Sequence, residues 1–119
     1  MPLLPNAALG QTSEEVVITS CYDGDTCTSS TGERIRLACI DTPELRGKRA
    51  EPVPAEAARD YLRELVVGRK VTIRRITTDR YGRTVAELSV DGINVGQDLV
   101  RRSHAVIYRK YAGPCAWTR

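Results

Sequence analysis

The chain has 119 residues, of which 41% are hydrophobic, and its formal net charge is +3. This length fits a single domain with a small core of its own. Because the sequence contains no Phe, that core must consist of aliphatic residues and a few Tyr. No stretch approaches the roughly 20 apolar residues of a membrane helix, which argues against a membrane-spanning protein. The mildly basic charge is compatible with a polyanionic partner but does not require one.

The N-terminal half of the sequence predicts an arm followed by a β-meander. Residues 1–13 are rich in Pro, Asn, Gly and Ser, which is typical of a loose arm, so we expect one domain at residues 14–119. Runs of β-branched and alternating apolar residues predict three strands, joined by tight turns, at residues 15–22, 26–30 and 34–40.

The remaining sequence predicts two helices and more strands. Pro54 favours the start of a helix, whose apolar stripe ends before Gly68. Strands at 71–77 and 84–90 follow, and Asn94 is a predicted N-cap with Gln97 as its capping-box partner. The second helix should run to about residue 103, before a short strand at 105–108. Five short strands with these helices predict an α+β fold, a β-barrel with helices of the five-stranded OB-fold type.

The four cysteines are Cys21, Cys27, Cys39 and Cys115, and their spacing fits no common zinc or redox motif. If the turn at residues 23–26 closes a hairpin, Cys21 and Cys27 face each other and could form a disulfide. The alternative is that all four are small buried hydrophobic residues without a disulfide. The sequence leaves both possibilities open.

Two acidic segments, DGDT at 23–26 and DTPE at 41–44, contain the candidate metal ligands. Asp25 and Asp41 could supply two carboxylates, and Thr42 a backbone carbonyl, to a calcium ion. This set needs neither His nor thiolate, which argues against zinc. Each segment also has a purely structural explanation, since Asp-Gly favours turns and a polar residue before Pro ends a strand.

Arginines near these segments indicate a phosphate ligand. Arg36 and Arg83 could hold phosphate oxygens through paired guanidinium donors, and Glu44 could orient or deprotonate a water. Arg36 and Asp41 have opposite parity along the predicted third strand, so a flat strand would place them on opposite faces. The site must therefore lie where this strand bends or ends. Together these residues predict metal-assisted cleavage of a phosphodiester.

The segments DGDT, RLACIDTPE and TDRYGR, in this order, resemble the thermonuclease (staphylococcal nuclease) family over about residues 14–111. The resemblance implies an SNase-like OB-fold and Ca²⁺-dependent hydrolysis of DNA and RNA, in single strands or loosened duplexes, leaving 3′-phosphate ends. The resemblance implies that Ca²⁺ is bound by Asp25, Asp41 and the Thr42 carbonyl, with Asp23 in the outer shell. It implies that the catalytic residues are Arg36, Glu44 and Arg83. It also implies that the nucleotide is contacted by Arg80, Tyr81 and Tyr108, with Tyr111 as an alternative to Tyr108.

The C-terminal end departs from the family, whose members continue into a third helix that this sequence lacks before Arg119. We therefore expect an uncovered apolar surface there, and either a monomer or weak self-association. Residues 1–13 lack the basic segment followed by an apolar segment that is typical of a secretory signal. The resemblance nevertheless favours a secreted or periplasmic protein.

Two other functions are compatible with this type of sequence. One is a non-catalytic OB-fold module that binds nucleic acid, and the other is a structural calcium site in an interaction domain. Domains of the family that have lost activity lack catalytic residues, whereas this chain keeps Arg36, Glu44 and Arg83. The retained residues favour the enzyme.

Overall fold

The computed structural model describes residues 13–119. The predicted arm comprises residues 1–13, of which 1–12 lie outside the described residues, and Ser13 belongs to no helix or strand. The elements, in chain order, are β1 (Glu14–Asp23), β2 (Thr26–Ser29), β3 (Arg34–Leu37), β4 (Ile40–Asp41), α2 (Pro52–Val66), β5 (Lys70–Thr78), β6 (Thr84–Val90), β7 (Ile93–Asn94), α3 (Val95–Arg101), β8 (Val106–Ile107), and the 3₁₀ turns η1 (Arg109–Tyr111) and η2 (Ala116–Thr118).

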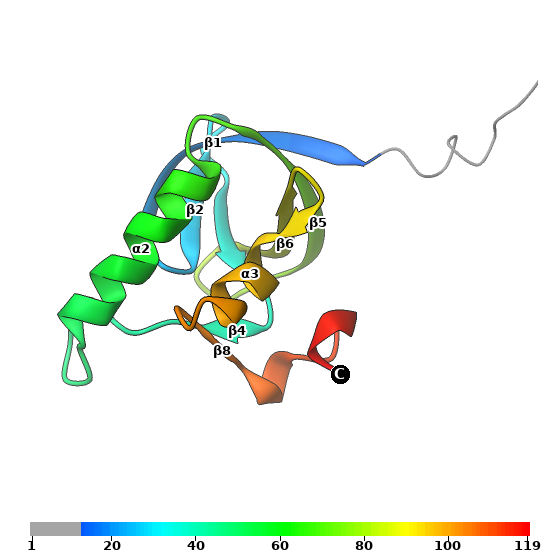
Figure 1. Ribbon diagram of the computed structural model, residues 1–119. Helices are drawn as coiled ribbons and strands as arrows, with labels where there is room; N and C mark the ends of the chain where they lie inside the picture. The colour runs from blue at the N-terminus through cyan, green and yellow to red at the C-terminus, as the bar shows by residue number, and fades with distance from the viewer. Residues whose placement is uncertain (1–12) are drawn as a thin grey trace, which may run out of the picture.

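Five of the strands close into a barrel. The main sheet has the order β3-β2-β1-β5-β6-β7, and a parallel pairing of β3 with β6 closes it, with Ile35 opposite Thr84 and Leu37 opposite Ala86. The predicted meander is present as antiparallel β1, β2 and β3. Figure 1 shows the strands curving around a common interior, with α2 along one side. The predicted five-stranded barrel with helices is confirmed, and the extra strands are short additions outside it.

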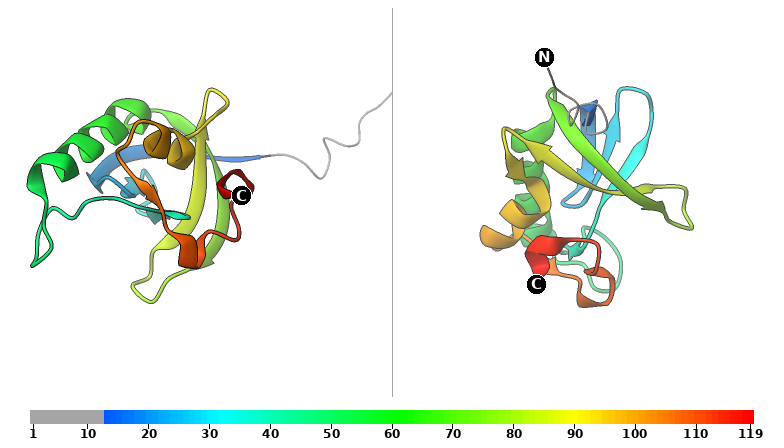
Figure 2. Two further views of the ribbon diagram at one scale, coloured as in Figure 1. Left: turned by 60° about the horizontal axis from the view of Figure 1, so that its bottom comes forward. Right: turned by 90° about the vertical axis from the view of Figure 1, so that its right-hand side faces the viewer.

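The core fills the barrel and extends beneath both helices. It is formed by aliphatic side chains such as Ile18, Ile35 and Leu88, all of which are fully buried. Figure 2 shows α2 and α3 on the same side of the barrel, and α2 packs against β1 and α3. The α2 face that is buried consists of Ala55, Ala58, Leu62 and Val66. This face accounts for most of the predicted apolar stripe.

The helix boundaries follow local signals. Helix α2 begins at Pro52, two residues before the predicted start, and Gly68 follows its end with φ of 80°. Asn94 is the N-cap of α3 as predicted, because its side chain accepts the Gln97 N–H at 3.0 Å. The helix ends at Arg101 rather than near residue 103. Neither described helix is long and apolar enough to span a membrane.

The prediction of one strand over residues 34–40 is wrong, because β3 ends at Leu37. The Leu37 N–H donates to the Asp25 carbonyl at 2.8 Å and the Ala38 N–H to the Ala86 carbonyl at 2.8 Å. Cys39 then adopts φ of 73° within a turn, which interrupts the extended strand. Strand β4 pairs with β8 in a separate two-stranded sheet. The site-bearing strand is therefore broken between Arg36 and Asp41.

The cysteines form two disulfides, Cys21–Cys27 and Cys39–Cys115. The first confirms the cross-strand pairing that the turn at residues 23–26 suggested, since Cys21 and Cys27 are register partners. The second joins residues 76 positions apart and was not predicted. Within residues 13–119 no α-helix follows α3, and the chain instead turns through η1 and η2 beside the barrel.

Candidate functional site

The hairpin between β1 and β2 holds Asp25 as a buried carboxylate that is only 7% exposed. Its Oδ1 accepts the Thr26 hydroxyl at 3.1 Å, and its Oδ2 accepts the Thr42 hydroxyl at 3.1 Å. Gly24 lets this hairpin approach α2, because a Cβ there would lie 2.9 Å from Cβ of Ala58. Asp25 is thus fixed by donors on both oxygens before any ligand arrives.

Arg36 lies between two carboxylates. Its Nη1 is 3.5 Å from Oδ2 of Asp25, and its Nη2 is 4.0 Å from Oδ1 of Asp41. Nη1 also donates to the Leu37 carbonyl at 2.6 Å. The break after Leu37 allows this approach, because side chains no longer alternate between the two faces of one strand from Arg36 to Asp41. Asp41 is held less firmly than Asp25, because 57% of its side chain is exposed.

Arg83 reaches the same group from the turn between β5 and β6. Its Nη1 donates to the Thr26 hydroxyl at 3.3 Å, so that Thr26 connects Arg83 with Asp25. Its Nε donates to Oδ2 of Asp79 at 2.7 Å. Among residues 13–119, Nη2 of Arg83 makes no hydrogen bond, which leaves donors for a ligand.

Asp79 keeps Arg83 and the turn in place. Its Oδ1 accepts the backbone N–H groups of Tyr81 and Arg83, each at 2.9 Å. Burial acts to raise the pKa of Asp79, but the hydrogen bonds from the Arg83 N–H, the Arg83 guanidinium and the Tyr81 N–H outweigh it and lower the pKa. Asp79 therefore remains ionised and balances the charge of Arg83.

The same turn presents an exposed aromatic ring. Tyr81 is 59% exposed, and the guanidinium carbons of Arg80 and Arg83 lie 5.1 Å and 5.6 Å from its ring centroid. Nη2 of Arg80 donates to the Tyr81 hydroxyl at 2.9 Å. Arg34 donates to the Tyr81 carbonyl. A flat ring flanked by two cations can stack a base beside a bound phosphate.

Asp23 adds negative charge beside Asp25. Its Oδ1 accepts the Asp25 N–H at 3.1 Å. Burial, together with the charge of Asp25 and the hydrogen bond with that side chain, raises the pKa of Asp23 to about 6. The three aspartates at positions 23, 25 and 41 make this corner acidic, and Arg36 is the cation that lies closest to Asp25 and Asp41.

Two predicted residues make no direct contact with this group. The Glu44 side chain is exposed, and its backbone pairs with Ala50 at the base of the loop before α2. Tyr108 packs edge-on against Tyr111 at a centroid distance of 5.0 Å, and its N–H donates to the Cys39 carbonyl at 2.8 Å. The structure therefore brings together the aspartates, Arg36, Thr42, Arg83 and Tyr81, and leaves Glu44 and Tyr108 at the periphery.

The oxygen ligands available fit a calcium ion. Asp25 and Asp41 lie on either side of one guanidinium. Thr42, whose hydroxyl reaches Asp25, follows Asp41 in the chain, and its backbone carbonyl would be the third oxygen of such a set. Within the described part of the chain, no three His, Cys, Asp or Glu side chains converge as a ready-made metal cluster. A hard cation that accepts carbonyls and water suits such a set, whereas the usual protein zinc sites are built mainly from His and Cys.

Sequence reasoning missed two residues of the site. Thr26 joins Asp25 to Arg83, and Asp79 fixes Arg83. Both were inside the segments DGDT and TDRYGR, which contain the predicted residues. The available signal was their position in the sequence: Thr26 directly follows Asp25, and Asp79 directly precedes Arg80.

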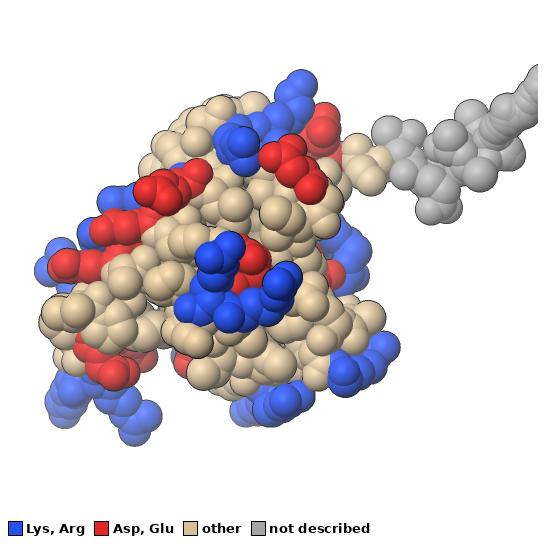
Figure 3. Space-filling model, viewed as in Figure 1, with Lys and Arg blue, Asp and Glu red and all other residues tan. Residues whose placement is uncertain are grey.

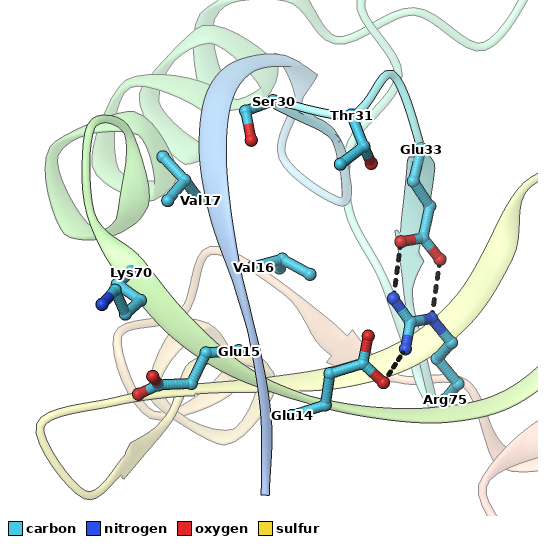
Figure 4. A pocket seen from close by; sticks show the side chains of 9 residues that line it. All are labelled: Glu14, Glu15, Val16, Val17, Ser30, Thr31, Glu33, Lys70 and Arg75. Atoms are coloured by element: carbon cyan, nitrogen blue, oxygen red, sulfur yellow. Dashed lines mark hydrogen bonds and ion pairs between the residues drawn. The ribbon is translucent and has the colours of Figure 1, made fainter.

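A separate hollow between the start of β1, β5 and the β2–β3 turn contains no comparable chemistry. Figure 4 shows the Arg75 guanidinium between Glu33 and Glu14. It donates to both oxygens of Glu33, at 2.8 Å and 2.7 Å. The Arg75 hydrogen bond lowers the pKa of Glu33 even though burial acts in the opposite direction. Arg75, Glu33 and Glu14 therefore pair with one another rather than with a ligand.

The surface charge alone does not locate the site. On the face shown in Figure 3, basic side chains gather over α3 and near the loop that leads into α2, while acidic groups lie along α2. Arg101 and Arg102 at the end of α3 are exposed, as are Arg46 and Lys48 in the loop. Both signs are interspersed, so geometry rather than net charge identifies the site.

Comparisons with known proteins agree with this geometry. The family model described as "Staphylococcal nuclease homologue" matches residues 34–116. An "Uncharacterized endonuclease" of Escherichia coli O157:H7 is 37% identical over 98 residues, which cover 79% of this chain and 61% of that protein. A "Probable endonuclease LCL3" of Komagataella phaffii is 31% identical over 80 residues, covering 62% of this chain and 35% of that protein.

A third relative comes from a plant. The "Probable staphylococcal-like nuclease CAN1" of Oryza sativa is 35% identical over 78 residues, covering 66% of this chain and 22% of that protein. The chain thus spans 61% of the length of the bacterial relative and smaller shares of the fungal and plant ones. Since the family model matches more than half of the chain, including β3, β5 and β6, the chain belongs to the staphylococcal nuclease family.

Proposed function

We propose that this chain is a calcium-dependent nuclease that hydrolyses phosphodiester bonds of DNA and RNA, in single strands or loosened duplexes. The observation that carries the proposal is the convergence of Asp25, Asp41 and Arg36, with Arg83 joined to them through Thr26. Carboxylates beside two guanidinium groups can hold a hard cation and a phosphate in the same place. Membership of the nuclease family supports this assignment.

In the proposed site, Asp25, Asp41 and the Thr42 carbonyl hold the ion, and Asp23 supports them from the outer shell. A bound calcium ion would polarise the phosphate and lower the pKa of an attached water. Asp25 is suited to its role because the hydroxyls of Thr26 and Thr42 fix both of its oxygens. Asp41 is more exposed and completes the site from the other side of Arg36.

The two arginines stabilise the charge that develops on the phosphate. The Nη2 donors of Arg36 and Arg83 make no hydrogen bond within residues 13–119, so both side chains have donors for the non-bridging oxygens. Asp79 holds Arg83 in place, and the Leu37 carbonyl holds Arg36. Donors that are fixed in advance lower the barrier because they need no reorganisation during the reaction.

Glu44 is the proposed general base. Its exposed carboxylate accepts a proton from the water that attacks phosphorus, and the bond from phosphorus to the 5′-oxygen then breaks. The departing 5′-oxygen takes its proton from solvent, since guanidinium groups do not deprotonate in proteins. The products are a 3′-phosphate end and a 5′-hydroxyl end. Arg80, Tyr81 and Tyr108 are the proposed contacts to the nucleotide beside the cleaved bond.

The alternative is a non-catalytic OB-fold module that binds nucleic acid, for which the exposed Tyr81 between two arginines would suffice. The enzyme is favoured because Asp25 and Asp41 have no use in stacking a base. A structural calcium site would explain the two aspartates but not the free donors of Arg83.

The deciding experiment incubates the oxidised protein with labelled single-stranded DNA and RNA, with calcium and then with a chelator. We expect cleavage only with calcium, and fragments that a polymerase extends only after phosphatase has removed the 3′-phosphate. Glu44→Gln is the matched inactive control. Binding without cleavage would support the non-catalytic module, and calcium-dependent stability without either would support the structural site.

We also propose an oxidising compartment, consistent with a secreted or periplasmic protein. All four cysteines are paired in disulfides, and such bonds persist outside the reducing cytosol. For self-association, the exposed Val106, Tyr108 and Tyr111 near the C-terminal end are the proposed contact surface.

A further inference from the structure

Residues 108–119, which we call the C-terminal cap, fold back onto the barrel beside the candidate site. Cys115 and Ala112 of the cap are buried in a second hydrophobic cluster with Ala38 and Cys39, which belong to the turn between β3 and β4. Figure 2 shows this segment returning along the barrel after β8. The cap therefore packs directly against the break that separates Arg36 from Asp41.

Polar contacts hold the cap to the barrel at its other end. Trp117 Nε1 donates to Oε1 of Glu87 at 2.9 Å, and Arg74 Nη2 donates to the Pro114 carbonyl at 2.8 Å. Glu87 also accepts the Asn94 side chain at 3.0 Å. These contacts lie on β5, β6 and the N-cap of α3, so the cap has a rigid support that does not involve the site.

Cys39 joins the cap to the site in two ways. Its sulfur is bonded to Cys115, and its carbonyl accepts the Tyr108 N–H at 2.8 Å. Its φ of 73° lies in the left-handed region, which residues other than Gly seldom occupy without support from their surroundings. The cap supplies that support, because it holds the turn by a covalent bond and a hydrogen bond.

This turn determines the position of Asp41. Asp41 follows Cys39 by two residues, its side chain is 57% exposed, and its backbone pairs with Val106 of β8. Asp25, by contrast, is buried and fixed by two hydroxyls. Of the two carboxylates proposed to bind calcium, Asp41 is therefore the one whose placement depends on the turn.

We propose that the Cys39–Cys115 disulfide is a positioning element that holds Asp41 and Tyr108 against the barrel, so that breaking it weakens the binding of calcium and nucleotide while the barrel remains folded. The role assigned to Asp41 and Tyr108 rests on the proposed function. A dithiol reductant would split the bond into two thiols and itself become a cyclic disulfide. The protein would then be a thiol-sensitive nuclease.

The Cys21–Cys27 disulfide provides a matched control. It spans only 6 residues and joins positions that the β1–β2 ladder already pairs. Its loss should leave the turn at Cys39 unchanged. The comparison is therefore between Cys39→Ser with Cys115→Ser and Cys21→Ser with Cys27→Ser. A further double variant, Cys39→Gly with Cys115→Ala, removes the same bond but lets glycine adopt the positive φ without strain.

The first measurement needs no metal. Amide hydrogen exchange of Tyr108, whose N–H donates to Cys39, should accelerate about tenfold or more in both variants that lack Cys39–Cys115. It should be unchanged in the Cys21–Cys27 control, and exchange in β5 and β6 should be unchanged in all variants that remain folded. An unchanged Tyr108 exchange rate without Cys39–Cys115 would overturn the inference, whatever the protein does to nucleic acids.

The second measurement is calcium binding by calorimetry on the folded variants. We expect a roughly tenfold or larger increase in Kd without Cys39–Cys115, as for the loss of groups that orient metal ligands, and less than a twofold change in the control. At saturating calcium, kcat should recover to within a few-fold while KM for an oligonucleotide stays raised. Calcium binding that is unchanged without the bond would refute the positioning role. If the oxidised wild type itself binds no calcium, the proposed function fails instead, and the exchange result alone decides the inference.

Discussion

Thr26 offers the sharpest test of how the site is assembled. Its hydroxyl donates to Asp25 at 3.1 Å and accepts from Arg83 at 3.3 Å, so one oxygen joins the proposed metal ligand to a proposed catalytic arginine. Thr26→Val replaces this hydroxyl with a methyl group of similar size and keeps a β-branched residue in β2. The change should therefore leave the barrel intact and separate Arg83 from Asp25.

The expected magnitude follows from these two hydrogen bonds. Both have a charged partner but are longer than the usual 2.7–2.9 Å of charge-assisted bonds, so each should contribute about 0.5–1 kcal/mol. A loss of about 1–2 kcal/mol of transition-state stabilisation lowers kcat/KM by roughly 5- to 30-fold. Because both hydrogen bonds are present in the free protein, the melting temperature should also fall by several degrees, partly offset by the preference of valine for a strand.

The assay compares initial rates on a short labelled single-stranded DNA at saturating calcium for wild type, Thr26→Val and Thr26→Ser. Serine retains the hydroxyl, so we expect it to keep most of the activity. Two outcomes would refute the reasoning: a wild-type kcat/KM in Thr26→Val, or an equal loss in Thr26→Ser. Circular dichroism of each variant checks that the fold is preserved.

Three further predictions concern catalysis, stability and assembly. Glu44→Gln and Arg83→Ala should each lower kcat by roughly 10²- to 10³-fold with an unchanged circular dichroism spectrum; unchanged rates would remove these residues from the mechanism. Burial acts to raise the pKa of Glu87, but hydrogen bonds from Arg74, Asn94 and Trp117 outweigh it and lower the pKa below the ordinary value of 4.5. The stabilisation by Glu87 is therefore present above that pH and is lost as the pH falls through the folded pKa. Glu87→Gln should therefore cost about 1–2 kcal/mol in urea unfolding at pH 7, and the cost should shrink steadily as the pH falls below 4.5. A cost that does not change with pH would contradict the linkage. In sedimentation velocity, weak association predicts a sedimentation coefficient that rises with protein concentration, and a constant monomer value would exclude it.

Local sequence signals were sufficient wherever neighbouring residues determine the structure. Asn94 with Gln97 predicted the start of α3, because a cap and its partner lie within one turn. Gly68 predicted the end of α2, since glycine readily adopts positive φ. The disulfide between Cys21 and Cys27 could be anticipated for the same reason, as a tight hairpin places them opposite each other.

The end of β3 shows the limit of such signals. The alternation at residues 34–40 predicted a continuous strand, but the Ala38 N–H bonds to Ala86, a distant residue in β6. Cys39 adopts positive φ with support from Tyr108 and Cys115, which are also far away in the sequence. A pattern of period two records which side chains are apolar and carries no information about these distant partners.

The sequence by itself determined the barrel class, the family and the residue types of the site, because turns, caps, apolar periodicity and short motifs are local properties. Only the tertiary structure decided that Thr26 joins Asp25 to Arg83 and that Cys39 pairs with Cys115. The parallel pairing of β3 with β6 closes the barrel and brings these segments together. Such contacts depend on the packing of the whole chain, so their partners cannot be read from spacing along the sequence.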